Sequence, residues 1–137
     1  MPIGIASTKW RTVSSRGKVI YLPNPNYRRG MRWEDRAAED LTALGYWVIQ
    51  TRGSRTPTDL VGLKNKHPVI LAQIKSPGVS IDGHGWNALY ELAELCGATA
   101  LVCDWEGRPL APVWFRIVDF HTPRGKFWPR EAWNETS

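Results

Sequence analysis

Two short apolar runs joined by a brief polar turn constrain the fold of this chain most strongly. They occupy residues 59–64 and 69–75, and a connection of four residues fits two neighbouring antiparallel strands. The first run opens with an acid, Asp59, and the second carries Gln73 and Lys75 near its end. Strand residues two apart point to the same face, so we expect Gln73 and Lys75 to emerge together beside Asp59.

The rest of the middle of the chain alternates between helical and strand patterns. Apolar residues recur at helical spacing over residues 33–44, and residues 46–51 form a β-leaning run. A second helical stripe covers residues 86–96, with Gly97 as its stop, and residues 98–104 are continuously apolar, as in a strand covered on both faces. The long connection from Lys75 through this helix is what a parallel crossover requires. The order predicts an α/β sandwich with a mixed sheet.

The two ends of the chain differ from this middle part. Residues 8–14 and 18–22 are β-leaning runs that suggest a hairpin, and the Pro-Asn repeat at 23–26 is expected to break regular structure. Residues 112–118 are expected to form the final strand. We therefore divide the chain into an N-terminal arm (1–28), a central domain (29–118) and a weakly ordered tail (119–137).

Charge is distributed unevenly along the 137 residues. The net charge is +5, yet residues 1–33 contain seven Lys and Arg residues and no acid, so the rest of the chain is slightly negative. An acid-free basic arm with interleaved aromatic residues favours a polyanionic partner, with nucleic acid the expected one. A solvated tail is the simpler alternative.

Composition narrows the class of protein further. The hydrophobic content of 42% is ordinary for a globular domain, no apolar run is long enough to span a membrane, and the N-terminus lacks a signal-peptide core. Cys96 and Cys103 lack metal-ligand spacing and are expected to be buried thiols in a reducing compartment, with the cytoplasm as the default. Most of the eight tryptophans are expected in the core or at a dimer surface.

The residues around the predicted hairpin suit phosphodiester chemistry. Magnesium takes oxygen ligands and keeps several waters, so one or two carboxylates suffice to hold it. Asp59 is the best candidate ligand, Glu34 can reach the site from the first helix, and Gln73 and the Ile74 carbonyl offer further oxygens. A protonated Lys75 would orient a water and stabilise developing negative charge. Ser54 and Arg55 lie just upstream of Asp59, where they can contact a phosphate.

In this order the segments resemble the PD-(D/E)XK nuclease superfamily, and most of all Holliday-junction resolvases of the archaeal and phage type. The likeness covers residues 29–118 and depends on residues 30–36, 52–54, 59–61, 73–75 and 114–116. It implies a restriction-endonuclease-like three-layer sandwich with an αβββαβ core. Two positions depart from the family pattern: Thr58 stands where the motif has proline, and Gln73 where it has a second acid.

The resemblance implies a catalytic set of Glu34, Ser54, Asp59, Gln73 and Lys75, of which Glu34, Asp59 and Gln73, with the carbonyl of Ile74, would hold Mg²⁺ or Mn²⁺. It implies a homodimer that binds four-way DNA junctions and cuts two strands symmetrically. The basic residues expected to contact DNA are Arg28, Arg29, Arg32, Arg52 and Arg55.

Simpler explanations exist for each residue taken alone. Asp59 can be an acid at a turn, Gln73 and Lys75 an edge-strand polar pair, and Glu34 a first-turn carboxylate at a helix start. Glu39 is a rival on a different face of the same helix. At the level of function, the alternatives are another nuclease of the superfamily (restriction, repair or flap type), an inactive DNA-binding relative and a protein scaffold. The three histidines match no zinc pattern.

Overall fold

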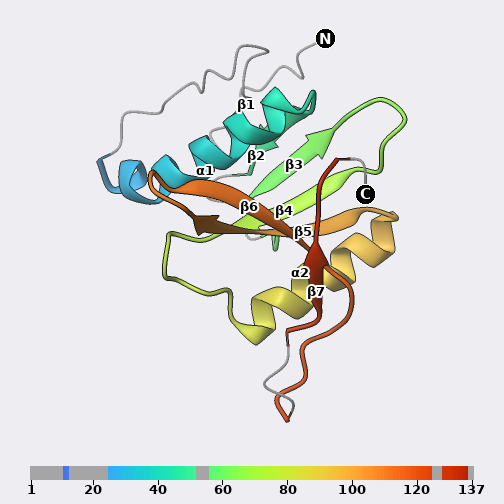
Figure 1. Cartoon of the computed structure of the whole chain (residues 1–137). Coiled ribbons are helices and arrows are strands. Elements are labelled where there is room, and N and C mark those ends of the chain that lie inside the picture. The colour runs from blue at the N-terminus through green and yellow to red at the C-terminus, as the bar shows by residue number, and fades with distance from the viewer. Residues whose placement is uncertain (1–10, 13–24, 52–55, 125–127, 136–137) are drawn as a thin grey trace.

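A computed structural model describes residues 11–12, 25–51, 56–124 and 128–135, with only the backbone of residues 11–12 and 25–31. In this part of the chain one seven-stranded sheet lies between two helices, one on each face (Figure 1). The elements in chain order are β1 (Arg11–Thr12), α1 (Pro25–Ala43), β2 (Trp47–Gln50), β3 (Leu60–Leu63), β4 (Ile70–Ile74), α2 (Gly83–Cys96), β5 (Thr99–Glu106), β6 (Ala111–Ile117) and β7 (Arg130–Ala132).

The strands lie in the sheet in the order in which they occur along the chain. Every neighbouring pair is antiparallel except β4 and β5, which run parallel and are joined through α2. The predicted hairpin is present, with Val61 paired to Leu71, and so is the predicted crossover, with Leu71 paired to Ala100. The expectation of an α/β sandwich with a mixed sheet is therefore confirmed.

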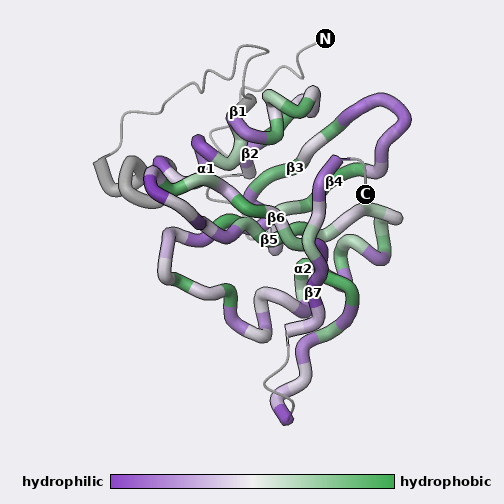
Figure 2. The backbone as a smooth tube through the Cα atoms, in the orientation of Figure 1, coloured by the Kyte–Doolittle hydropathy of each residue, from purple (hydrophilic) through white to green (hydrophobic). Residues whose placement is uncertain are grey.

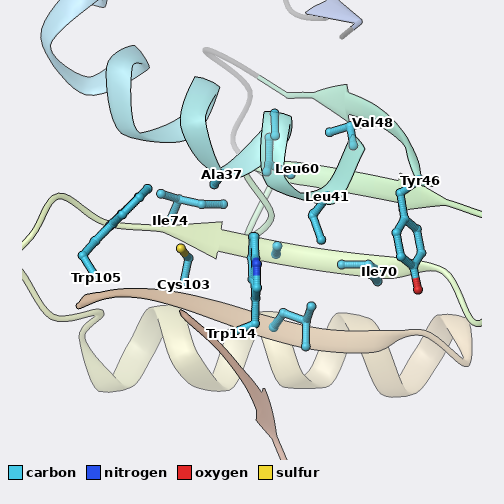
Figure 3. Close-up of a cluster of buried hydrophobic side chains, with 13 residues drawn as sticks. Ala37, Leu41, Tyr46, Val48, Leu60, Ile70, Ile74, Cys103, Trp105 and Trp114 are labelled. Atoms are coloured by element: carbon cyan, nitrogen blue, oxygen red, sulfur yellow. The ribbon is translucent and has the colours of Figure 1, made fainter. Parts of the chain in front are cut away.

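Successive side chains of the central strands point to opposite faces of the sheet, so two separate cores form, one on each face. On the α1 side, Leu60, Ile70, Ala72 and Ile74 pack with residues from the helix such as Leu41 (Figure 3). On the α2 side, Leu71 and Val102 pack with residues from that helix, among them Trp86 and Leu89. The strands in the middle are accordingly the most apolar part of the tube, whereas the turn between β3 and β4 is hydrophilic (Figure 2).

Helix α1 begins earlier than the sequence indicated. It starts at Pro25 rather than at Trp33, so the expected break at 23–26 is wrong in its second half. Proline is well tolerated at the first position of a helix, because its fixed φ suits the helix and the missing N–H has no intrahelical partner there. The last residues of the predicted arm, including Arg28 and Arg29, are thus part of this helix.

The N-terminal hairpin is only partly within the described residues. Its first run contains β1, which pairs antiparallel with β2, while its second run, residues 18–22, lies outside them. The sheet therefore extends beyond the predicted central domain on this side.

The C-terminal region is more ordered than a tail. Strand β7 pairs with β6, so residues 112–118 are not the final strand. The backbone N–H of Trp133 donates to the carbonyl of Trp114, and the Trp133 ring packs against the α1-side core, while Trp128 packs against the α2-side core. The sequence signal for this ordered region is the pair of large aromatic residues, because their burial stabilises the short strand.

Helix α2 starts three residues before the predicted helix and ends as expected. Asp82 caps its N-terminus by accepting a hydrogen bond from the Gly85 N–H at 2.6 Å, and His84 lies in the first turn. Gly97 ends the helix in the left-handed region, with φ 65°.

The two cysteines differ in environment. Cys103 is buried as predicted, and burial, as the main cause, raises the pKa of its thiol. Cys96 is exposed at the end of α2, so the prediction that both thiols are buried is wrong for this one. The buried face of α2 consists of Trp86, Leu89 and Ala93 and thus ends three residues before Cys96.

Among the helices that the structure describes, none combines the length and apolar character needed to cross a membrane.

Candidate active site

Asp59 lies at the point where β3 meets the end of β4. Its backbone N–H donates to the Ala72 carbonyl at 2.8 Å, and its own carbonyl accepts from the Thr51 N–H at 2.9 Å. The side chain turns toward β4, where Oδ2 accepts a hydrogen bond from the Ile74 N–H at 2.9 Å. Two backbone hydrogen bonds, to β4 and to the residue after β2, thus hold Asp59 in place, and a third holds its carboxylate beside the residue that precedes Lys75.

Thr58, which stands where the family motif has proline, is buried next to Asp59. Its hydroxyl lies within hydrogen-bonding distance of the carbonyls of Leu60 and Ala72, at 2.6 and 3.1 Å. The Thr58 carbonyl in turn accepts from the Thr51 hydroxyl. The Thr58 hydroxyl therefore ties the segment before Asp59 to β4 by a hydrogen bond that proline, which has no hydroxyl, cannot donate.

The electrostatic environment of Asp59 combines burial with two favourable partners. Burial raises the pKa of the Asp59 carboxyl, while the Ile74 N–H and the nearby Lys75 charge lower it, and burial is the larger effect. Lys75 directly follows Ile74, whose backbone N–H donates to the Asp59 carboxylate, so the two residues are neighbours at this end of β4. Because the pKa of Asp59 stays raised despite these two partners, an additional positive charge would further stabilise the ionised carboxylate.

Gln73 and Lys75 share one face of β4, as alternation requires. Both line a cavity of about 380 Å³ on the α2 side of the sheet. The Gln73 Oε1 atom is buried and has no hydrogen-bond donor among the described residues. It lies toward the first turn of α2, since a Cβ added to Gly85 would be 3.4 Å from it. A buried amide oxygen without a donor is the kind of group that a ligand or cation satisfies.

Glu34 lies on the stripe of α1 that faces the sheet. It precedes the buried Ala37, Ala38 and Leu41 by three, four and seven residues, the spacing of one helix face. It is partly buried, whereas the rival Glu39 is exposed. That Glu34 reaches the site from this face of the helix stays a prediction.

The beginning of this stripe lies over the same end of the sheet as Lys75. Trp33, next to Glu34, packs on Trp105 with ring centroids 4.8 Å apart, and the Trp105 indole N–H donates to the Lys75 carbonyl at 2.8 Å. Trp105 and Ile74 lie together at one end of the core, while Tyr46 and Ile70 lie at the other (Figure 3). The described contacts thus place Glu34, Asp59 and Lys75 near one end of the sheet, with Glu34 on its α1 face and the Lys75 side chain on its α2 face.

A second link between α1 and this region was not anticipated from sequence. The Gln50 side-chain amide donates to the Asp35 carboxylate at 3.3 Å, and both residues are buried. Gln50 pairs with Leu60 across β2 and β3, directly beside Asp59. The sequence signal for this hydrogen bond was Asp35, an acid at a position of the helix where the inward-facing residues are otherwise apolar.

Asp104 is another residue near the site that sequence reasoning passed over. The pairing of Ile74 with Cys103 makes Lys75 and Asp104 the next neighbours along the parallel strands, and Asp104 lines the same cavity. Its position as the last residue of the apolar run 98–104, in a strand predicted to be parallel to the Lys75 strand, was the available signal.

Several predicted residues cannot be placed with the others. Ser54, Arg52 and Arg55 lie outside the described residues, as do the side chains of Arg28 and Arg29. Arg32 is exposed, with its guanidinium 4.8 Å from the centroid of the Trp33 ring. Within the described ranges no three His, Cys, Asp or Glu side chains are grouped as a metal site.

Comparison with protein-family models and with curated protein sequences found no match.

Proposed function

We propose that the chain is a magnesium-dependent endodeoxyribonuclease of the PD-(D/E)XK type that cuts branched DNA as a homodimeric Holliday-junction resolvase. The observation that carries this proposal is the Asp59 carboxylate, hydrogen-bonded to the Ile74 N–H with Lys75 close by. Acid and ammonium at the meeting point of two strands are the polar groups that phosphodiester hydrolysis requires.

The residues present suit a divalent cation. Asp59, Gln73 and the Ile74 carbonyl, with Glu34 from α1, are the oxygen donors that would hold Mg²⁺ or Mn²⁺, and the raised pKa of Asp59 and the unsatisfied Gln73 Oε1 favour an added positive charge. Such an ion supplies Lewis-acid polarisation of the phosphate and a more acidic water.

The protein's own groups perform the remaining tasks. Lys75, as an ammonium, orients the attacking water and stabilises negative charge as it develops on the phosphate. The Ile74 N–H keeps Asp59 turned toward this point, and Thr58 fixes the backbone that carries Asp59. Trp105 holds the Lys75 backbone through its indole N–H.

Binding of DNA is assigned to the basic residues at the N-terminal side. Arg28 and Arg29 belong to the first turns of α1, whose C-terminal continuation carries Glu34, so positive charge adjoins the proposed site along one helix. Arg32, Arg52 and Arg55 would add phosphate contacts. The clustering of these residues in sequence around the catalytic ones supports a polyanionic substrate.

A panel of DNA substrates tests this proposal. Four-way junctions, flaps and linear duplexes are incubated side by side with Mg²⁺ and with EDTA, using the parental chain, Lys75→Ala and Lys66→Ala. Lys66 is exposed on the turn between β3 and β4 and serves as the matched control. We expect metal-dependent cutting of the junction that Lys75→Ala abolishes and Lys66→Ala preserves, with junction binding intact in both variants.

The same panel separates the alternatives. Preference for flaps or for linear duplex would indicate another nuclease of the superfamily. Junction binding without cutting in any metal would indicate a non-catalytic DNA-binding protein, an alternative favoured by the amide of Gln73 where the motif has an acid. Absence of binding to every DNA at low salt would reject the proposal altogether.

A further inference from the structure

The cavity lined by Gln73 and Lys75 also contains groups that are not part of the proposed catalytic set. Beyond Gln73 and Lys75 it is lined by Ser80 and Trp86, by Asp104 on β5 and by Trp128 and Arg130 near the C-terminus. Its volume of about 380 Å³ lies within the range of small-molecule sites. It combines an aromatic wall, an acid and a guanidinium.

The aromatic wall is held in place from two sides. Trp128 stacks on His121 with centroids 3.7 Å apart and an interplanar angle of 9°, and it meets Trp86 edge-on at 5.2 Å. His121 is itself fixed to α2, because its N–H donates to the Asn87 side chain at 2.7 Å and its carbonyl accepts from that side chain at 3.1 Å. A preordered ring loses little entropy when a planar ligand stacks on it.

The polar part of the cavity is a loosely paired acid and base. The shortest contact between Arg130 and Asp104 is 3.7 Å, and their side chains are 39% and 51% exposed. The Arg130 guanidinium also lies 3.9 Å from the centroid of the Phe115 ring, which orients it. A carboxylate acceptor beside a guanidinium donor matches a planar edge that presents an amine next to a ring acceptor.

Cytosine and adenine present such an edge, with the 4-amino or 6-amino group beside a ring nitrogen that accepts hydrogen bonds. Stacking on aromatic side chains and reading of this edge are how proteins hold bases that have left the duplex. Lys75 lines the same cavity, so a base held there would be joined to a phosphate near the proposed catalytic groups.

We propose that the cavity formed by Trp128, Asp104 and Arg130 receives an unpaired cytosine or adenine of the DNA next to the phosphate that is cut. This inference rests on the proposed nuclease function, and it adds that the enzyme selects strands whose bases are free to leave the stack, as at a branch point.

The test is carried out first on the metal-free full chain with dCMP, dAMP, dTMP and 2-deoxyribose 5-phosphate as probes. The reporter is the indole ¹H–¹⁵N resonance of Trp128, identified by its loss in Trp128→Leu. We expect dCMP and dAMP to shift this resonance with at least about fivefold higher affinity than 2-deoxyribose 5-phosphate, because the sugar phosphate lacks the stacking contribution. An equal response to the sugar phosphate, or no response, would overturn the proposal.

Two surface variants keep the test independent of folding. Asp104→Ala and Arg130→Gln change partly exposed side chains, and each is expected to reduce the preference of dCMP over dTMP, with Lys66→Ala, on the exposed turn between β3 and β4, as a control that keeps it. Unchanged preference in both variants would contradict the assignment.

Cleavage assays distinguish a failure of this inference from a failure of the proposed nuclease function on which it rests. Base-selective binding without cleavage of any DNA would retain the cavity and reject the nuclease. Metal-dependent cleavage that Lys75→Ala abolishes, together with no base-selective shift, would retain the nuclease and reject the cavity. If both hold, replacing the nucleotide beside the cut by an abasic one should raise KM for the junction several-fold.

Discussion

The Oδ2 atom of Asp59 lies 2.9 Å from the backbone nitrogen of Ile74, the residue that precedes Lys75. This hydrogen bond joins the acid at the start of β3 to the end of β4, and it makes the position of the carboxylate depend on the pairing of the two strands. Burial nonetheless raises the pKa of Asp59, more than the Ile74 N–H and the Lys75 charge lower it.

A defined pH dependence of stability follows from that raised pKa. The folded chain holds the Asp59 proton more tightly than the unfolded chain, so the contribution of this group to the free energy of unfolding is greatest below the unfolded pKa of about 3.9 and is lost as the pH rises through the folded pKa. Asp59→Asn should remove this decrease while leaving the remaining pH profile unchanged. Urea unfolding of both proteins between about pH 3.5 and pH 8 measures this loss of stability, because the range begins near the unfolded pKa and extends well above it.

Magnesium provides the complementary measurement. If Asp59 contributes to a cation site, Mg²⁺ should raise the melting temperature of the parental chain at neutral pH and leave that of Asp59→Asn unchanged. Identical pH profiles in the two proteins would show that burial does not raise the pKa of Asp59, and identical responses to Mg²⁺ would show that Asp59 does not hold the ion.

The substitution Gln73→Glu tests the amide at the second acidic position. An added carboxylate increases the negative charge of the site, so we expect the Mg²⁺ concentration for half-maximal cleavage to fall on the order of tenfold. Without metal the variant should be less stable than the parental chain, because a second acid would be buried near Asp59. A variant that cuts where the parental chain does not would identify the natural site as inactive.

Thr58→Val tests whether the residue in place of the motif proline positions Asp59. Valine keeps the branched shape but removes the hydroxyl that reaches the carbonyls of Leu60 and Ala72. We expect a loss of about 1 kcal/mol in the free energy of unfolding, and a fall in kcat on the order of tenfold with KM for the junction unchanged, because the carboxylate is displaced.

The control for this variant is Thr42→Val. The Thr42 hydroxyl also donates to a backbone carbonyl, that of Ala38 at 2.7 Å, but it lies within α1. Its loss should leave kcat at the parental value. Equal effects of the two substitutions on kcat would mean that Thr58 has a structural role only.

Sequence periodicity was sufficient to predict the elements at the centre of the fold but not those near the two ends of the chain. The β3–β4 hairpin and the parallel β4–β5 crossover follow from connection length and apolar pattern, which are local properties. The first turns of α1 and strand β7 do not, because Pro25 reads equally as a breaker or a helix start and because β7 is only three residues long. Such short elements are stabilised by tertiary packing, as Trp128 and Trp133 illustrate.

The candidate site was likewise predictable only in part from the sequence. Alternation along β4 predicted that Gln73 and Lys75 share a face, and the strand order predicted that Asp59 lies beside them. The roles of Thr58, Asp35 and Asp104 depend on contacts between elements distant in sequence, such as the bond from Gln50 to Asp35. A single sequence does not contain the orientation of side chains across such contacts.

The arginines at the start of α1 give a prediction about salt dependence. Removing residues 1–28 would also remove β1 and the first turns of α1, so the charges are better changed in place as Arg28→Gln with Arg29→Gln. If both side chains neutralise DNA phosphates, the slope of log K against log salt concentration should become shallower by about 2. Fluorescence anisotropy of a labelled junction across a salt series gives the slope.

The control is Arg116→Gln, which also removes one positive charge. Arg116 is paired with Glu131 at 2.7 Å, on strands β6 and β7, and its loss should leave the slope unchanged. A parental slope in the double variant would assign DNA binding to other residues.

Trp114 links β6 to α1 and gives a stability prediction that does not depend on function. Its indole N–H donates to the Asp40 carboxylate at 2.7 Å, and its side chain is buried in the α1-side core. In Trp114→Phe the smaller ring leaves space in the core, and Asp40 loses its donor, so we expect the free energy of unfolding to fall by about 2–4 kcal/mol. Asp40→Asn keeps an acceptor oxygen opposite the indole and should lose less than about 1 kcal/mol. If Asp40→Asn is as destabilising as Trp114→Phe, the charge of Asp40, rather than the packing of the indole ring, is what holds α1 against β6.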